Sequence, residues 1–210
     1  MGAWTNNLTF VADDGDGNLH FEDTESHTQI FRNLFNNYNI DKIYLDAFTQ
    51  QSGQGGETYP DVNKAIQDKI FNGSFIMNYA GHGKETGWCK ENVLNSNDII
   101  NLTNFDKLPL FITATCTFTK VDDPDIHSAG ELLLTNPNGG AIAIVSTVRV
   151  VFASANKDIN ENFLLSAFDS ENGVHPTLGR ATMLAKNAIT SSASNARKFA
   201  LFGDPALTLN

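Results

Sequence analysis

The chain has 210 residues, of which 41% are hydrophobic and 10% aromatic, enough for one domain with a substantial core. Its net charge of −10 argues against a nucleic-acid surface, which needs clustered Lys and Arg, and against docking on an anionic membrane. No apolar run approaches the roughly 20 residues that span a bilayer.

Apolar runs alternate with amphipathic stretches along the whole chain, a pattern typical of an α/β sheet covered by helices. The runs that we expect to be strands are 8–12, 42–45, 74–79, 108–115, 141–146 and 199–202. Helical spacing marks 30–38, 61–71, 128–134, 159–168 and 176–189, and polar loops cover 13–18, 50–57 and 84–97. The sequence therefore predicts an α/β fold with about six mostly parallel strands and helices on both faces.

No internal repeat or linker divides the chain, so we expect one domain over residues 1–210. The first four residues carry neither the basic nor the apolar region of a signal peptide. Because the core begins within a few residues of the start, we expect the chain to be cut from a longer protein.

Four polar or reactive residues follow predicted strands: Asp14, His82, Cys116 and Ser146. In open parallel sheets, ligands bind beyond the carboxyl ends of the strands. The acidic loop, the imidazole, the thiol and the segment after the fifth strand are therefore expected to surround one crevice.

A cysteine nucleophile needs a base within hydrogen-bond reach, and His82 is the candidate base for Cys116. An imidazolium favours the thiolate and then donates its proton to a leaving amine. The peptide N–H groups of Gly83 and Cys116 are candidates for an oxyanion hole, and Gly81 and Gly83 carry no Cβ to block a substrate. The alternative is a buried structural thiol beside a histidine in a turn.

The acidic loop 13–18 has three interpretations. One carboxylate could orient His82 as the third member of a triad, and Asp14 is the candidate. The loop could bind calcium, since Asp14, Asp16, Asn18 and Glu25 match positions 1, 3, 5 and 12 of an EF-hand, although Leu19 replaces its glycine. It could also be a solvated turn.

The remaining histidines, His20, His27, His127 and His175, have no ligand spacing with Cys or carboxylates, so no zinc site is expected. A Cys89–Cys116 disulfide is an open alternative to the nucleophile. Trp88 and Phe152 could line a specificity pocket or simply pack in the core.

Four segments, in order, resemble the gingipains, the C25 family of cysteine peptidases. They are the histidine segment 79–88, the nucleophile strand 108–116, the next strand 140–147 and the Phe-Gly-Asp-Pro motif within 201–207. Within this family, residues 10–20 most resemble the PorU-type sortases of the type IX secretion system. The match covers nearly the whole chain.

The resemblance implies a caspase-like fold, with His82 as acid/base and Cys116 as nucleophile. It implies an enzyme on the extracellular face of the outer membrane of a Bacteroidetes-type bacterium. Its partners would be the C-terminal sorting domains of secreted proteins and other type IX secretion components, with anionic lipopolysaccharide as acceptor of the cleaved cargo. No cofactor is required, and calcium is left open.

Departures from the family pattern affect the expected site. Gingipains carry Glu-Glu-Gly where this chain has Asp13-Asp14-Gly15, so Asp14 would be the third catalytic residue, one methylene shorter. The acidic residue that accepts arginine falls near Thr24, beside Glu25, and the Trp that closes that pocket falls near Phe152. Substrate contacts are therefore expected at Trp88, Phe152, Thr24 and Glu25, without strict arginine specificity. Gingipains also carry an N-terminal subdomain, so this chain would be the catalytic half.

Three functions compete at this stage. The first is a sortase-type cysteine peptidase that transfers its acyl-enzyme, and the second is a secreted endopeptidase of the same family that only hydrolyses. The third is a binding module on a caspase-like scaffold, in which the His82 and Cys116 pair is unused. We expect the polar loops 50–57 and 84–97 to need ordering by substrate or partner.

Overall fold

The buried apolar runs form one sheet in the computed structural model, which describes residues 2–171, 173–189 and 193–209. The strand order is β11-β10-β9-β5-β1-β2. The strands are β1 (Asn7–Ala12), β2 (Asn39–Tyr44), β5 (Ile76–Ala80), β9 (Leu110–Ala114), β10 (Ala143–Thr147) and β11 (Phe199–Phe202). Within this sheet as described, β11 alone runs antiparallel to its neighbour. The prediction of about six mostly parallel strands is confirmed.

The central strands β5, β9 and β10 are buried at every residue, which is why they read as continuous apolar runs. Successive side chains alternate between two cores, one on each face of the sheet. In β5, Ile76 packs into one core and Met77 into the other, and in β9, Leu110 and Phe111 do the same.

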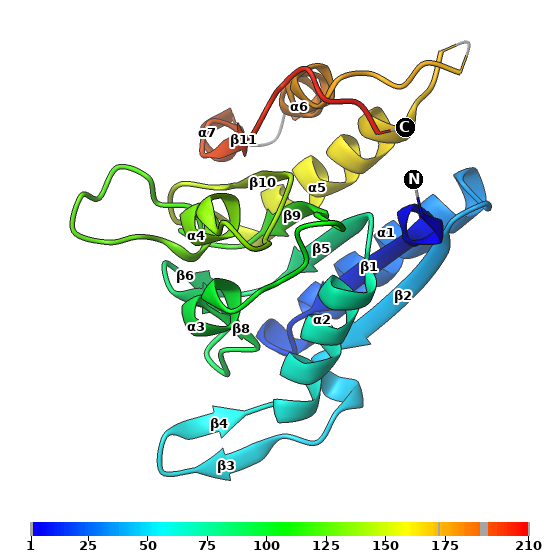
Figure 1. Ribbon diagram of the computed structural model, residues 1–210. Coiled ribbons are helices and arrows are strands. Elements are labelled where there is room, and N and C mark those ends of the chain that lie inside the picture. The colour runs from blue at the N-terminus through cyan, green and yellow to red at the C-terminus, as the bar shows by residue number, and fades with distance from the viewer. Residues whose placement is uncertain (1, 172, 190–192, 210) are drawn as a thin grey trace.

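Helices cover both faces of the sheet (Figure 1). They are α1 (Leu19–Leu34), α2 (Pro60–Asn72), α3 (Ser96–Ile100), α4 (Ala129–Thr135), α5 (Ala153–Phe168), α6 (Leu178–Ala188) and α7 (Ala193–Ala196), with 3-10 turns η1 (Ala3–Asn6), η2 (Asp16–Asn18) and η3 (Leu45–Ala47). Side chains of α1, α5 and α6 fill one core, and those of α2, α3 and α4 fill the other. The layered α/β prediction is therefore confirmed.

Helix α1 differs most from its prediction. It begins at Leu19, directly after the acidic loop, and ends at Leu34, whereas the sequence pattern placed a helix over 30–38. Its buried face is largely polar, with His20, Thr24 and His27 facing inward, so apolar periodicity is missing from its first three turns.

Two stretches that we expected to be loops form small sheets. Strands β3 (Gln51–Gly53) and β4 (Gly56–Thr58) make an exposed hairpin that projects below α2 in Figure 1. Strands β6 (Gly83–Lys84), β7 (Gly87–Trp88) and β8 (Leu94–Asn95) make a three-stranded sheet. The hairpin lacks the apolar alternation by which half-buried strands are recognised, so the sequence could not reveal it.

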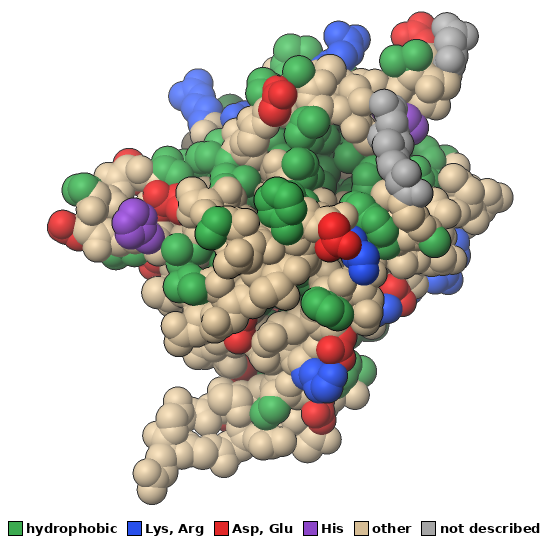
Figure 2. Space-filling view, viewed as in Figure 1, with side chains coloured by type: hydrophobic (Ala, Val, Ile, Leu, Met, Phe, Trp, Pro, Cys, Tyr) green, Lys and Arg blue, Asp and Glu red, His purple; other side chains and the backbone are tan. Residues whose placement is uncertain are grey.

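A groove of about 320 Å³ lies at the amino ends of the central strands, and it is largely apolar. Trp4, Phe75, Phe105, Ile142 and Leu178 line it. Hydrophobic side chains gather in the upper half of the face shown in Figure 2.

Among the described helices, none is both long and apolar enough to cross a membrane.

Candidate active site

Strands β5 and β9 bring His82 and Cys116 to the same edge of the sheet. The two strands are parallel neighbours with Ala80 opposite Ala114, and the Gly81 N–H donates to the Ala114 carbonyl at 3.3 Å. His82 and Cys116 each stand two residues beyond this matched pair. They therefore occupy equivalent positions at adjacent carboxyl ends, as the strand pattern predicted.

The imidazole and the thiol have other partners in this structure. The Cys116 thiol donates to the Val151 carbonyl across 3.7 Å, and Nε2 of His82 lies 3.2 Å from Oδ2 of Asp16. Among the described residues, no hydrogen bond joins His82 to Cys116. The catalytic pairing thus remains a prediction, and catalytic hydrogen bonds often tighten when substrate binds.

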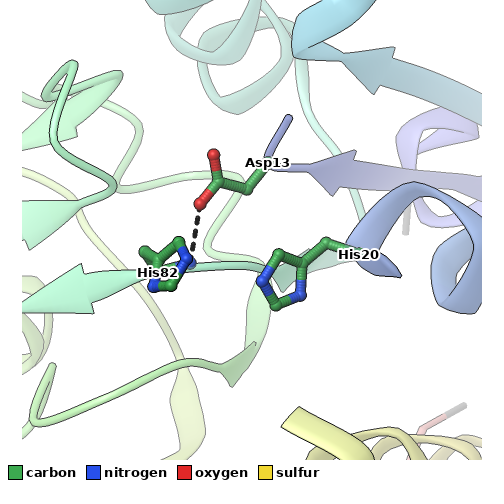
Figure 3. A group of neighbouring side chains, drawn as sticks. All are labelled: Asp13, His20 and His82. Carbon is green, nitrogen blue, oxygen red and sulfur yellow. Dashed lines mark hydrogen bonds between the residues drawn. The ribbon is translucent and has the colours of Figure 1, made fainter. Parts of the chain in front are cut away.

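The main chain of His82 is held from both sides, whereas its ring is 46% exposed. Oδ2 of the buried Asp13 accepts the His82 N–H at 2.8 Å, the dashed contact in Figure 3. The His82 carbonyl accepts the Tyr79 hydroxyl at 2.6 Å and the Cys89 N–H at 2.8 Å. These hydrogen bonds fix the position of the His82 main chain and leave its imidazole ring accessible to a ligand.

Asp16 and His20 complete the surroundings of the imidazole. Oδ2 of Asp16 lies 3.2 Å from Nε2 of His82 and 3.5 Å from Nε2 of His20. The two rings meet edge to face, with centroids 5.3 Å apart. One carboxylate therefore faces two imidazoles.

Left-handed backbone shapes the loop that carries Asp16. Asp16, Gly17 and Asn18 have φ values of 56°, 63° and 72°. This conformation is disfavoured for residues with a Cβ, although Asp and Asn tolerate it best. Such strain is characteristic of functional sites, where surrounding structure compensates for it.

Three glycines let the chain pack closely around His82. A Cβ at Gly15 would lie 2.8 Å from Cδ2 of His82, and one at Gly81 would lie 2.4 Å from the Tyr79 hydroxyl. A Cβ at Gly83 would lie 2.3 Å from the Thr115 hydroxyl. Gly81 and Gly83 thus make room for the protein's own side chains, whereas the sequence had suggested a substrate.

Asp14 does not occupy the place predicted for it. Its Oδ2 accepts the Tyr59 hydroxyl at 2.6 Å, and the carboxylate that contacts the imidazole belongs to Asp16. The EF-hand ligand set is also separated. Asp14 bonds to Tyr59, Asp16 faces two histidines, and Glu25 is paired with Lys42. These carboxylates thus have different partners in this structure, and calcium binding by the loop stays a prediction.

Burial shifts the protonation of two groups beside His82. Desolvation raises the pKa of the Asp13 carboxyl, while the His82 main-chain N–H and the histidine charges oppose this. Desolvation lowers the pKa of His20, and the carboxylates of Asp13 and Asp16 oppose it. Burial therefore favours the neutral imidazole at His20.

The two cysteines differ in environment, and neither forms a disulfide. Cys89 is 2% exposed, and burial raises the pKa of its thiol. Cys116 is partly exposed. The next residue, Thr117, has a φ of 47°, an outlier for a β-branched side chain. Of the two thiols, Cys116 is the one that a substrate can reach.

Two of the four predicted substrate contacts, Trp88 and Thr24, are corrected by the structure, and Glu25 is held by neighbouring side chains. Trp88 is fully buried and stacks on Tyr79 with ring centroids 4.3 Å apart, so it is a core residue. Thr24 is fully buried in α1. Glu25 is bound to Lys42 at 2.6 Å and to Tyr44 at 2.9 Å, and its pKa falls to about 2, chiefly through the Lys42 hydrogen bond.

Phe152 remains available for a substrate. It is 70% exposed at the start of α5 and follows Val151, whose carbonyl accepts the Cys116 thiol. The Lys198 ammonium lies 5.6 Å from its ring centroid. The packed alternative for Phe152 is therefore wrong, and its role as a substrate contact stays a prediction.

Sequence reasoning missed Asp16 and His20 as neighbours of the imidazole. Asp16 lies in the acidic loop with φ 56°, and His20 is in the first turn of α1, so no single helical period links the two. The helix over 30–38, predicted from apolar residues alone, left His20 outside any element.

Comparisons with known proteins point to one peptidase family. The sequence model of peptidase family C25 matches residues 1–210. Gingipain R2 of Porphyromonas gingivalis (strain W83) is 25% identical, over 93% of this chain and 26% of that protein. Gingipain R1 of P. gingivalis is also 25% identical, over 93% of this chain and 19% of that protein. The chain thus spans about a quarter or less of these relatives.

Solved structures show the same fold. The crystal structure of the Arg-specific cysteine proteinase gingipain R (RgpB) superposes with a TM-score of 0.77 at 19% identity, covering 98% of this chain and 48% of that one. The Saccharomyces cerevisiae separase–securin complex superposes with a TM-score of 0.63 at 13% identity, over 94% of this chain and 12% of that one. At these identities the likeness concerns the fold, and the caspase-like prediction is confirmed.

Proposed function

Since the chain belongs to peptidase family C25, we propose that it is a cysteine peptidase with Cys116 as nucleophile and His82 as general acid and base. The observation that carries the proposal is the in-register pairing of β5 with β9, whose last pair, Ala80 and Ala114, lies two residues before His82 and Cys116. A nucleophile and a base at adjacent strand ends are the elements that acyl transfer requires.

In the proposed reaction, Sγ of Cys116 attacks the carbonyl carbon of a peptide bond while His82 holds the thiol proton. His82 then protonates the leaving amine as the C–N bond breaks, which leaves a thioester on Cys116. The N–H groups of Gly83 and Cys116 are the proposed donors to the oxyanion. Water or an amine attacks the thioester and frees the thiol.

We propose that Asp16 has the orienting role that the resemblance had suggested for Asp14. Its carboxylate lies 3.2 Å from Nε2 of His82, close enough to hold the ring. Both side chains are nearly half exposed, so water weakens this interaction compared with a buried triad. We therefore treat Asp16 as a positioning residue.

We further propose that the peptidase is a sortase at the cell surface. It would cleave C-terminal sorting domains from secreted cargo, work with other type IX secretion components, and pass the acyl group to an anionic glycolipid. Support for this finer function comes from the resemblance of residues 10–20 to PorU-type sortases. A peptidase that only hydrolyses is the alternative from the same chemistry.

Two experiments separate these functions. Cys116→Ala and His82→Ala should each abolish cleavage of a cargo fusion that ends in a sorting domain, with the circular dichroism spectrum unchanged. Cleavage that survives in either variant would contradict the peptidase proposal. With an added amine as acceptor, aminolysis products support the sortase, and hydrolysis alone supports the simple peptidase.

A further inference from the structure

Three potential metal ligands converge beside the proposed catalytic centre. A carboxylate oxygen of Asp13 and one ring nitrogen each of His20 and His82 all lie within 4.8 Å of one another. They come from three segments: the end of β1, the start of α1 and the turn after β5 (Figure 3). Sequence spacing could not reveal this set, because 62 residues separate the two histidines.

The second observation is an unsatisfied buried nitrogen. His20 is 6% exposed, and its Nε2 has no hydrogen-bond partner among the described residues. Oδ2 of Asp16 lies 3.5 Å from it, beyond a good hydrogen bond. A buried nitrogen left without a partner is costly, so its conformation calls for a ligand in the space that it shares with His82.

We propose that Asp13, His20 and His82, with Asp16 as a fourth ligand, bind a divalent transition-metal ion such as Zn²⁺ that reversibly inhibits the enzyme. The inhibitory role rests on the proposed peptidase function, whereas binding of the metal does not. Nothing in the family pattern of His82 and Cys116 requires His20.

Binding an ion of this class would draw together the ligand atoms of Asp13, His20 and His82, which here lie within 4.8 Å of one another. Tetrahedral Zn²⁺ with bonds of about 2.1 Å holds neighbouring ligand atoms about 3.4 Å apart. Oδ2 of Asp16 already lies 3.2 Å and 3.5 Å from the Nε2 atoms of His82 and His20. Asp13 must approach, and the half-exposed ring of His82 can rotate to meet it. Two imidazoles and two carboxylates are ligands that zinc accepts.

The charge of the proposed site and its exposure to solvent also suit a divalent metal ion. Asp13 and Asp16 together match the charge of a divalent cation. His82 and Asp16 are 46% and 49% exposed at the side chain, which opens a path for the ion. A second cluster, Asp13 with Cys89 and Glu91, lies nearby, but Cys89 is 2% exposed and offers no such path.

A metal at this place would block catalysis through His82. Its lone pair would be donated to the ion and could not hold the proton of Cys116, and the ring would be fixed toward His20. Removing the ion would restore the free imidazole. The site would keep the enzyme inactive where zinc is abundant and release it where zinc is scarce.

The test is a titration of the 210-residue chain with Zn²⁺ by calorimetry, and with Co²⁺ followed by its visible absorption. We expect one ion per chain and a four-coordinate Co²⁺ spectrum without a thiolate charge-transfer band. His20→Ala and the exposed Asp16→Asn should each weaken binding at least tenfold. The exposed His127→Ala and the thiol variant Cys116→Ala should bind as the original chain does.

The outcomes separate this inference from the proposed function. Unchanged affinity in both folded His20→Ala and Asp16→Asn, or a thiolate band that Cys89→Ala or Cys116→Ala removes, would overturn the site. If the chain cleaves no peptide but binding still depends on His20, the peptidase proposal fails and the metal site stands. If the chain is active and saturating Zn²⁺ leaves its rate unchanged, the inhibitory role is wrong.

Discussion

Oδ2 of Asp16 lies 3.2 Å from Nε2 of His82, on a residue that the sequence pattern passed over. The neighbouring Asp14, favoured by its resemblance to the family motif, is bonded to Tyr59 instead. Because Asp16 and not Asp14 contacts His82, a variant of Asp16 should lower turnover more than the same variant of Asp14.

Asp16→Asn should lower kcat about tenfold and leave KM nearly unchanged, because it removes the charge that orients His82 and no substrate contact. The matched variant Asp14→Asn keeps an acceptor for the Tyr59 hydroxyl and should change kcat less than about twofold. Steady-state kinetics on one peptide checks both. A larger loss in Asp14→Asn than in Asp16→Asn would return the orienting role to Asp14.

Gly15→Ala should impair catalysis without unfolding the chain. Gly15 has φ −67°, which alanine adopts readily, but its Cβ would lie 2.8 Å from Cδ2 and 3.1 Å from Nε2 of His82. The half-exposed ring must therefore move, and we expect kcat/KM to fall about tenfold with little change in Tm.

Gly17→Ala is the opposite control. Gly17 has φ 63° and open space where a Cβ would project, so alanine there strains the backbone and touches nothing. We expect a loss of about 1 kcal/mol in stability, measured by urea unfolding, with the larger part of kcat/KM retained. If both variants lost only stability, packing of Gly15 against His82 would not matter to catalysis.

Phe152 and Trp88 should respond in opposite ways. Phe152→Ala should keep Tm and raise KM about tenfold, since the ring is 70% exposed near Cys116. Trp88→Ala should cost about 3–5 kcal/mol, because the fully buried indole stacks on Tyr79. Thermal unfolding and KM measured on both variants test this, and an unchanged KM in Phe152→Ala would remove Phe152 from the substrate site.

His27 should make the fold sensitive to acid. The ring is 2% exposed, and burial lowers its pKa from 6.5 to about 4. Between these pH values the unfolded chain binds a proton that the folded chain does not, so stability falls as pH falls. The loss approaches about 3 kcal/mol below pH 4.

The variant His27→Leu should remove that part of the pH dependence. Unfolding in urea at pH 7 and pH 4.5 should show a smaller difference for His27→Leu than for the original chain. The exposed His127→Leu serves as the control and should show the original difference. An equal difference in all three chains would mean that His27 is not the group responsible.

The sequence predicted the parts of this fold that depend on burial. Strands β5, β9 and β10 have every residue buried, so their apolar runs gave both their positions and their carboxyl ends. These carboxyl ends in turn predicted that His82 and Cys116 lie near each other. Where strands are exposed, as in the β3–β4 hairpin, the apolar pattern did not predict them.

The directions in which polar side chains point could not be predicted from the apolar runs. Whether Asp14 or Asp16 faces His82 depends on three successive left-handed residues, and Gly-rich acidic loops can take several such paths. His20 was missed because the inward face of α1 is polar, so apolar periodicity did not predict the first turns of this helix. The proposed orienting carboxylate and the proposed metal ligands therefore needed the three-dimensional structure.

The most direct test of the central claim is the alkylation rate of each thiol near neutral pH, resolved by mass spectrometry, in the original chain and in His82→Ala. We predict that Cys116 reacts much faster than Cys89, and that His82→Ala removes most of this advantage because the imidazole favours the thiolate. Cys89 should stay slow in both chains, since it is buried. If Cys116 reacted at the same rate with and without His82, the two residues would not act together, and the proposed peptidase centre would be contradicted.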